Sequence, residues 1–169
     1  SPRTGGMALL AAVILLLPLV LPNNYWYEVA ILIGINAIVC VGLNYRDHAA
    51  EMKKPLPPEP LLFLKPSTTV LDPGATIRLP PGVGRVDHEA ELAIVIGRRA
   101  HRVTRARAWD HVFGFTCLND VTARDIQNKE TQYTRAKGFD TFAPFGPCVA
   151  VGRGDEPRRV EGWVNGVRR

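Results

Sequence analysis

The sequence predicts an α+β fold that is mainly β, and three observations support this class. Residues 61–82 alternate short β-type segments with Pro and Gly turns. Residues 85–97 and 112–120 are two further runs of strand length with β-type composition. Within residues 38–169, helices are predicted only after Asp47 and around Thr104. Strands are therefore expected to carry the fold, with few helical elements between them.

The first part of the chain has a different composition. From Met7 to Leu43 the only charged residue is Glu28. The apolar run from Met7 to Leu21 is a little shorter than the roughly 20 residues that a bilayer span needs. We therefore predict that residues 1–37 form an apolar, helical leader that contacts or enters a membrane. A secretory signal peptide and an ordinary buried helix are the alternatives.

A second domain is predicted over residues 38–169. Its first segment, IVCVGLNY (38–45), fits either the end of a membrane helix or a buried strand that leads into a helix. Asp47 can cap that helix, which places His48 and Glu51 on one face. A glutamate bonded to one imidazole nitrogen leaves the other free to take a proton from water, although an incidental surface pair is the alternative.

Two glutamates stand two residues apart in RVDHEAELAIVIG (85–97). Side chains alternate along a strand, so Glu89 and Glu91 share one face with Cα atoms about 7 Å apart, and His88 lies on the other. The strand becomes apolar on both faces, which predicts burial on both. Two interpretations are open for the two carboxylates. They either mark the solvated start of a strand or bind a hard cation, since neighbouring carboxylates resist ionising together unless a cation is present.

A third carboxylate follows at Asp120, where the predicted strand VFGFTCLND (112–120) ends. Arg124, Gln127 and Lys137 lie beyond it. Lys137 precedes GFDTF, a stretch rich in aromatic residues. It is either an ordinary solvated lysine or a cation held close to the three acids.

The composition limits the class of partner and the compartment. The net charge is +5, concentrated in the segments 98–109 and 158–169. These segments have little aromatic interleaving and match no nucleic-acid module, so we predict solvated basic turns and no nucleic-acid partner. Cys40, Cys117 and Cys148 are odd in number and widely spaced, which favours reduced thiols in the cytoplasm.

Five segments in this order resemble the fumarylacetoacetate hydrolase family: VGLNYRDHAAEM, FLKPST, VDHEAELAIVIG, GFTCLNDVTARDIQ and RAKGFDTFAPFGP. The resemblance runs from about residue 38 to the end. It implies part of a mixed β-sandwich roll, a homodimer and a divalent ion, Mg²⁺ or Mn²⁺, with Ca²⁺ as a further option. Residues 7–44 instead resemble the first membrane helices of permease subunits of branched-chain amino acid ABC transporters.

The family resemblance also implies roles for single residues. The implied metal ligands are Glu89, Glu91 and Asp120, and the implied catalytic groups are Lys137 and the pair His48 and Glu51 on a mobile lid. Arg124 and Gln127 correspond to substrate-binding positions. Three carboxylates suit Mg²⁺ or Mn²⁺ and leave positions for a chelating 2-oxo acid, whose carbonyl the ion polarises.

We therefore expect a metal-dependent hydrolase of C–C bonds in small 2-oxo acids. A hydroxymuconate-type isomerase, an oxaloacetate decarboxylase and a permease-derived membrane fragment are the alternatives, and the fold does not choose among the enzymes. The enzyme domain is expected in the cytoplasm, with membrane association through residues 7–37. The chain ends at WVNGVRR, before the further strands of a full family domain, so we expect open sheet edges and a poorly folded or inactive chain.

Overall fold

The computed structural model describes residues 37–152, 154 and 158–169. Its strands are β1 (Ala37–Gly42), β2 (Leu61–Pro66), β3 (Val70–Leu71), β4 (Val86–Asp87), β5 (Ala90–Ile96), β6 (Val112–Asn119), β7 (Thr122–Ala123), β8 (Ala143–Val151), β9 (Trp163–Val164) and β10 (Val167–Arg168). Its helical elements are α3 (Arg46–Glu51), α4 (Arg124–Gln127), α5 (Thr134–Lys137) and the 3-10 helices η1 (Ser67–Thr69) and η2 (Arg105–His111).

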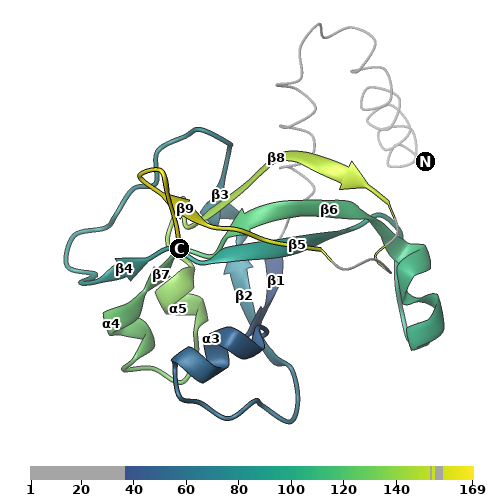
Figure 1. The fold of residues 1–169 in the computed structure, drawn as a ribbon, viewed down its shortest axis with the longest axis horizontal. Coiled ribbons are helices and arrows are strands. Elements are labelled where there is room, and N and C mark those ends of the chain that lie inside the picture. Colours follow the sequence, from purple (N-terminus) through teal and green to yellow (C-terminus); the bar gives the residue numbers. More distant parts are fainter. Residues whose placement is uncertain (1–36, 153, 155–157) are drawn as a thin grey trace, which may run out of the picture. The chain divides into compact units, whose positions relative to one another are not determined.

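A four-stranded sheet in the order β3-β8-β6-β5 forms the centre of the described fold. The strands β5, β6 and β8 are antiparallel neighbours, whereas β3 pairs with β8 in parallel. In the β5–β6 hairpin, Glu91 lies opposite Leu118 and Ile94 lies opposite Phe115. Figure 1 shows α3, α4 and α5 on one side of this hairpin and η2 at its far end. This side carries the candidate site.

The hairpin continues, after a break, into the short antiparallel pair β4–β7, in which Val86 lies opposite Ala123. Two hydrogen bonds cross the break: the Asp120 N–H donates to the Glu89 carbonyl at 2.9 Å, and the Glu89 N–H donates to Asn119 Oδ1 at 3.1 Å. The regular pattern of strand hydrogen bonds stops at these residues, and these two isolated hydrogen bonds hold the backbone there. The break brings the Glu89 and Asp120 side chains together.

The buried apolar core lies around the β4–β7 pair. Its members are Val83, Val121, Ala123 and Phe142, with Ile77, Val86, Ile126 and Phe139 packed against them. Phe139 meets Phe142 edge to face, with ring centroids 5.3 Å apart, a geometry that aromatic pairs prefer. Burial of these side chains stabilises the folded chain by the hydrophobic effect. The core therefore fixes the segment that carries Asp120.

Gly84 makes a close approach possible at the edge of this core. Its φ is +73°, in the left-handed region that glycine enters at little cost. A Cβ at this position would overlap the Asp125 carboxylate, which accepts a hydrogen bond from the Arg85 N–H at 3.2 Å. Only glycine satisfies both conditions, and the turn before β4 is fixed as a result.

The predicted α+β, mainly β class is confirmed, and the alternatives left open for residues 38–45 are resolved. This segment contains strand β1 and leads into a helix, so it is not the end of a membrane helix. Most of the predicted apolar leader, residues 1–36, lies outside the described residues. Within the described part of the chain, no helix has the length and apolar character needed to span a bilayer.

The helix expected around Thr104 is found as the 3-10 helix η2, whose N-terminal cap residue is Thr104. Two other local predictions were wrong. Asp47 does not cap α3, because the helix begins at Arg46 and its N-terminal cap residue is Tyr45, with no side-chain cap hydrogen bond. The strand β5 is not buried on both faces, because Ile94 is 49% and Ile96 60% exposed. Ile94 and Ile96 lie on the same face of the strand, and the described residues leave that face uncovered there, which apolar composition alone does not reveal.

Candidate active site

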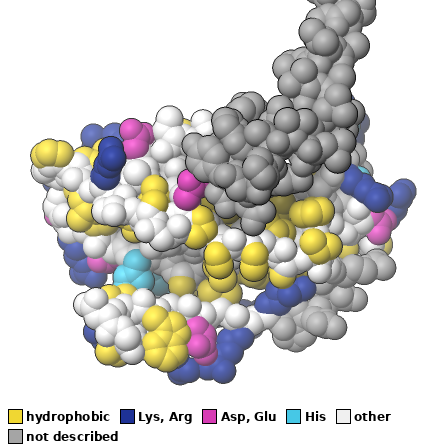
Figure 2. Space-filling view, turned by 90° about the horizontal axis from the view of Figure 1, so that it is seen from above, with side chains coloured by type: hydrophobic (Ala, Val, Ile, Leu, Met, Phe, Trp, Pro, Cys, Tyr) yellow, Lys and Arg dark blue, Asp and Glu magenta, His cyan; other side chains and the backbone are white. Residues whose placement is uncertain are grey.

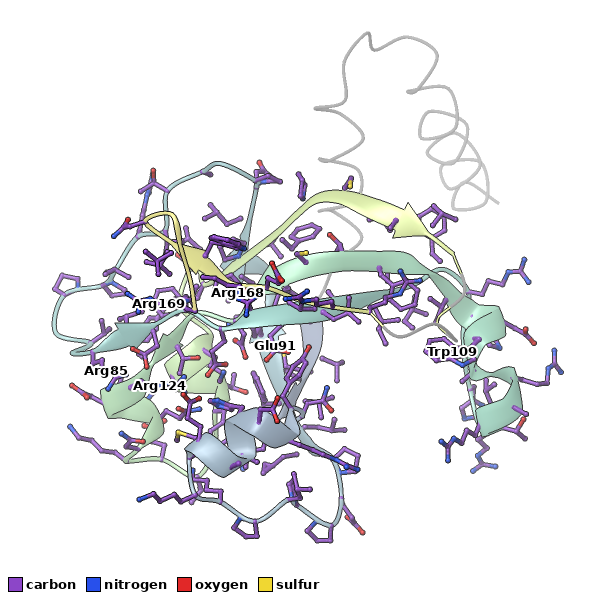
Figure 3. The ribbon with its side chains drawn as sticks, in the orientation of Figure 1. Arg85, Glu91, Trp109, Arg124, Arg168 and Arg169 are labelled. Carbon is purple, nitrogen blue, oxygen red and sulfur yellow. The ribbon has the colours of Figure 1, made fainter. Side chains whose placement is uncertain are left out.

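One pocket gathers most of the residues predicted from the sequence. Its lining includes His48, Glu89, Glu91, Asp120, Arg124, Gln127 and Lys137, but not Glu51. These side chains come from α3, β5, α4, α5 and the break in the β-ladder. Figure 3 shows Glu91 on the side of β5 that faces the helices, with Arg124 nearby on α4. His88 lines a different, more apolar pocket with Pro147 and Trp163, as strand alternation predicts.

Lys137 connects two of the carboxylates. Its Nζ donates to Glu89 Oε2 and to Asp120 Oδ2, each at 2.6 Å. The side chain is only 4% exposed, and Nζ lies 5.1 Å from the centroid of the Phe63 ring. Lys137 is therefore a buried cation in contact with the acids and not a solvated lysine. Buried charges of this kind require such partners.

Lys65 is a second buried cation that the sequence-based site did not include. Its side chain is fully buried, and Nζ donates to Asp120 Oδ1 at 2.6 Å and to the Val121 carbonyl at 3.4 Å. Burial lowers the pKa of Lys65, and the Asp120 carboxylate opposes this shift. Strand alternation provides the missed signal, since Phe63 and Lys65 of FLKPST lie on the same buried face of β2.

Arg124 forms hydrogen bonds with three other side chains. Its Nε donates to Asp87 at 2.8 Å, its Nη1 to Gln127 Oε1 at 2.7 Å and its Nη2 to Glu89 Oε1 at 2.5 Å. Burial alone would raise the pKa of Glu89, but Lys137 and Arg124 together lower it. Glu89 is thus held as an anion by two cations. A guanidinium has five N–H groups, so Arg124 keeps donors for a further contact.

Glu91 differs from the other two carboxylates. No ion pair of Glu91 is found within the described ranges. Burial raises the pKa of Glu91 to about 7, with further contributions from the negative charges of Asp120 and Glu89, while a hydrogen bond from Tyr45 opposes the shift. The site therefore holds one partly buried carboxylate whose negative charge is not neutralised by a neighbouring side chain. Its environment favours either a proton or an added cation.

The predicted pair on α3, His48 and Glu51, lies close together but is not hydrogen-bonded. His48 Nδ1 lies 3.7 Å from Glu51 Oε2, which is longer than a hydrogen bond. The His48 side chain is 33% exposed and borders the pocket, whereas Glu51 is 81% exposed. The structure therefore brings His48 to the site and leaves Glu51 in solvent.

The donor set matches the chemistry of a hard divalent cation, because three carboxylates supply oxygen ligands and Glu91 lacks a compensating charge. Their arrangement is not that of a closed metal centre. Among the residues that the structure describes, no group of three or more His, Cys, Asp or Glu is placed to hold an ion. Glu89 and Asp120 instead contact the ammonium group of Lys137, with which an ion would compete.

The sequence and the fold both match one class of enzymes. Residues 37–169 match the C-terminal domain of fumarylacetoacetate (FAA) hydrolase, and the chain belongs to this family. The expected family membership is confirmed. Members of the family are enzymes, and they generally use divalent metal ions.

Three similar proteins illustrate the family. An uncharacterized protein of Archaeoglobus fulgidus is 51% identical, over 76% of this chain and 52% of its own length. Oxaloacetate tautomerase YisK of Bacillus subtilis is 43% identical, over 78% and 46%. The crystal structure of 5-carboxymethyl-2-hydroxymuconate delta-isomerase from Mycobacterium smegmatis has a TM-score of 0.61 and 47% identity, covering 69% of this chain and 46% of that one.

These comparisons correct one expectation and qualify another. The resemblance of residues 7–44 to transporter permeases is not supported, because the family match begins at residue 37 and the relatives are enzymes of this family. The names of the relatives favour an isomerase over the hydrolase that was expected first. The chain spans about half the length of the curated relatives it matches.

Proposed function

We propose that this chain forms the active-site part of a tautomerase or isomerase that acts on small 2-oxo acids. The observation that carries the proposal is the pocket that three carboxylates, three cationic side chains and one histidine line, with two of the cations bonded to the carboxylates. The choice of isomerisation is supported by the relatives named oxaloacetate tautomerase and hydroxymuconate isomerase. Hydrolysis of a C–C bond is the weaker alternative.

The proposed reaction is a proton transfer next to a ketone. A proton leaves the carbon adjacent to the carbonyl, and a proton is added to the carbonyl oxygen, so no group is gained or lost. A negative charge develops on that oxygen during the transfer. Lys137 brings a buried ammonium group to the pocket, where the low dielectric strengthens its attraction for this charge.

His48 is the proposed proton carrier. It borders the pocket and is one-third exposed, so it can exchange protons with solvent between turnovers. Histidine suits this role because its unperturbed pKa lies near neutral pH. Glu51 lies on the same face of α3 and would orient the imidazole if the 3.7 Å separation shortened. Apo sites often show such long contacts.

The substrate would be held by polar groups at the α4 side of the pocket. Gln127 accepts a hydrogen bond from Arg124 through its side-chain oxygen, which leaves the amide N–H₂ free to donate. Arg124 retains guanidinium N–H groups beyond the three that it uses. Both side chains can therefore donate to a substrate carboxylate, and Arg124 also holds Glu89 in place.

Glu89, Glu91 and Asp120 are the proposed ligands of the divalent ion, which would be Mg²⁺ or Mn²⁺, with Ca²⁺ as an alternative. When bound, the ion would act as a Lewis acid that polarises the 2-oxo group. Glu89 and Asp120 form ion pairs, whereas Glu91 forms none among the described residues. Lys65 donates to Asp120 Oδ1, and Lys137 donates to Asp120 Oδ2, so both carboxylate oxygens have a partner.

An absorbance assay tests this function. The full chain with Mg²⁺ is mixed with enol oxaloacetate, and conversion to the keto form is followed in the ultraviolet, while acetylpyruvate is followed by NMR for cleavage. We expect tautomerisation above the uncatalysed rate and a loss of about 10²-fold or more in His48→Gln and Lys137→Met. The matched control is Glu59→Gln, which removes an exposed carboxylate outside the pocket. Cleavage of acetylpyruvate without tautomerisation would contradict the proposal in favour of a hydrolase.

A further inference from the structure

Asp87 connects two arginines at the end of β4. Arg85 contacts both of its carboxylate oxygens, with Nε donating to Oδ1 at 2.8 Å and Nη2 donating to Oδ2 at 2.9 Å. Oδ2 also accepts a hydrogen bond from Arg124 Nε at 2.8 Å. The backbone supports this contact, because the Arg124 N–H donates to the Arg85 carbonyl at 2.8 Å. Figure 3 shows the two arginines close together beside β4 and α4.

Arg124 divides one edge of its guanidinium group between two carboxylates. Nε and Nη2 form an edge that can hold a single carboxylate through two parallel hydrogen bonds, as Arg85 holds Asp87. In Arg124, Nε instead donates to Asp87 and Nη2 donates to Glu89 Oε1. Glu89 therefore receives one hydrogen bond from Arg124, and its other oxygen, Oε2, is bonded to Lys137.

The guanidinium group is held from three sides. Besides the two carboxylates, Gln127 Oε1 accepts a hydrogen bond from Nη1 at 2.7 Å. Each Nη carries two N–H groups and uses one, so one N–H remains on each. The Arg124 side chain is 13% exposed and lines the pocket, whereas Asp87 does not line it. Any effect of Asp87 on the site therefore acts through Arg124.

We propose that Asp87 is a positioning residue for Arg124. By accepting the Nε–H, it prevents Arg124 from closing on Glu89 with two parallel hydrogen bonds. Glu89 Oε2 is thereby left to Lys137, and the two remaining Nη N–H groups keep a fixed direction toward a substrate carboxylate. The substrate contact rests on the proposed function, but the orientation of Arg124 does not. Asp87 suits this role because hydrogen bonds between ionised groups are stronger than those between neutral groups.

Crystal structures of variants test the orientation without substrate or metal. In Asp87→Ala we expect Arg124 to turn until Nε and Nη2 both donate to Glu89, each at about 3 Å. Asp87→Ser is a second variant that keeps a polar group but is too short to reach Arg124, and it should give the same result. Asp87→Asn keeps an oxygen acceptor and should keep the native orientation.

Arg85→Met is the matched control for these structures. It removes the other arginine, whose side chain is 72% exposed, and leaves the contact between Asp87 and Arg124 in place. The strand pairing of Asp87 with Thr122 is also unaffected. Arg124 should therefore keep its native orientation. An unchanged Arg124 in Asp87→Ala and Asp87→Ser, or the same turn in Arg85→Met, would overturn the proposal.

Kinetics test the consequence for the substrate. In the enol oxaloacetate assay, Asp87→Ala should raise KM about tenfold and change kcat less than about threefold, because Arg124 binds the carboxylate equally before and during the reaction. Asp87→Ala should add nothing in an Arg124→Lys background, since lysine has no Nε–H edge to orient. Effects on KM that add in the double variant would overturn the proposal, because Asp87 would then act independently of Arg124.

The two measurements separate this proposal from the proposed function. A native chain without tautomerase activity would contradict the proposed function, while the crystal structures would still decide whether Asp87 orients Arg124. An active chain in which Asp87→Ala changes neither the orientation of Arg124 nor KM would keep the proposed function and overturn the role of Asp87.

Discussion

At the scale of single residues, charges of opposite sign alternate through the site. Lys65 contacts Asp120, Asp120 contacts Lys137, and Lys137 contacts Glu89. Strand alternation and the position after a strand indicated the three acids, whereas the aromatic stretch after Lys137 left open whether this lysine is solvated or held close to them. It did not indicate which cation neutralises which acid, since these contacts join residues up to 55 positions apart. Such pairing depends on tertiary structure.

Removal of Lys137 should be strongly destabilising. Lys137→Met keeps the length of the side chain but leaves Glu89 and Asp120 buried without one of their partners. We expect a loss of about 3–5 kcal/mol in the free energy of unfolding, measured by urea denaturation. The control is Lys129→Met, because Lys129 is exposed and its change should cost less than about 0.5 kcal/mol. A loss below about 1 kcal/mol for Lys137→Met would show that the buried contacts contribute little.

Asp87 should make stability depend on pH. Hydrogen bonds from Arg85 lower the pKa of Asp87 below its ordinary value of 3.8, burial opposes this, and Arg124 adds to the lowering. A carboxyl with a lowered folded-state pKa contributes stability that is present above 3.8 and is lost as the pH falls through the folded-state pKa.

Asp87→Asn should therefore lower the free energy of unfolding by about 1 kcal/mol at pH 7. The difference from the native chain should become smaller when the pH falls below the ordinary pKa of an aspartate. Urea denaturation at neutral and acidic pH measures it. Asp72→Asn changes an exposed carboxylate and provides the control. The interpretation fails if the cost of Asp87→Asn is the same at both pH values.

At the scale of elements, local sequence patterns predicted where the strands lie. They did not predict which other strands and residues surround each one. The strand expected over 112–120 is found as β6. Glu89 and Glu91, which were expected to share one face, line the same pocket. The break between β5 and β4 was not predicted, although it brings Glu89 next to Asp120. The break depends on the pairing of β4 with β7, and no local pattern encodes a partner that lies 35 or more residues away.

The turn before β4 gives a test at this scale. Gly84→Ala places a Cβ at a φ of +73° and against the Asp125 carboxylate. We expect a loss of about 1–3 kcal/mol in the free energy of unfolding, because a left-handed backbone and a steric overlap both disfavour alanine. Gly74→Ala is a matched control with φ of +80° and open space around the Cβ position, so it isolates the backbone cost. Equal losses in the two variants would show that the contact with Asp125 is unimportant.

At the scale of the whole molecule, the described part exposes many apolar side chains. Figure 2 shows hydrophobic side chains at the surface of one face. The β1–β2 pair exposes apolar side chains on one face. Val39 is 64% exposed, Leu62 63% and Leu64 49%. Contiguous apolar surface of this kind promotes association or marks a contact with further protein. The expected homodimer, the cytoplasmic location and the division at residue 37 stay predictions.

Self-association of the chain should depend on this surface. The double variant Leu62→Lys/Leu64→Lys should sediment with less concentration-dependent association than the native chain. Its free energy of unfolding should change by less than about 1 kcal/mol, because both side chains are about half exposed or more. Unchanged association would place the interaction surface elsewhere.

We propose above that Glu89, Glu91 and Asp120 form a cation site that receives a 2-oxo acid. The most direct measurement is a calorimetric titration of Mn²⁺ into the full chain, with and without oxalate as a mimic of the substrate enolate. Glu89→Gln/Glu91→Gln is the test variant, and Glu59→Gln is the control. Our account predicts binding that oxalate strengthens, that the test variant loses and that the control keeps. The absence of Mn²⁺ binding by the folded native chain, or equal binding by the test variant, would contradict it.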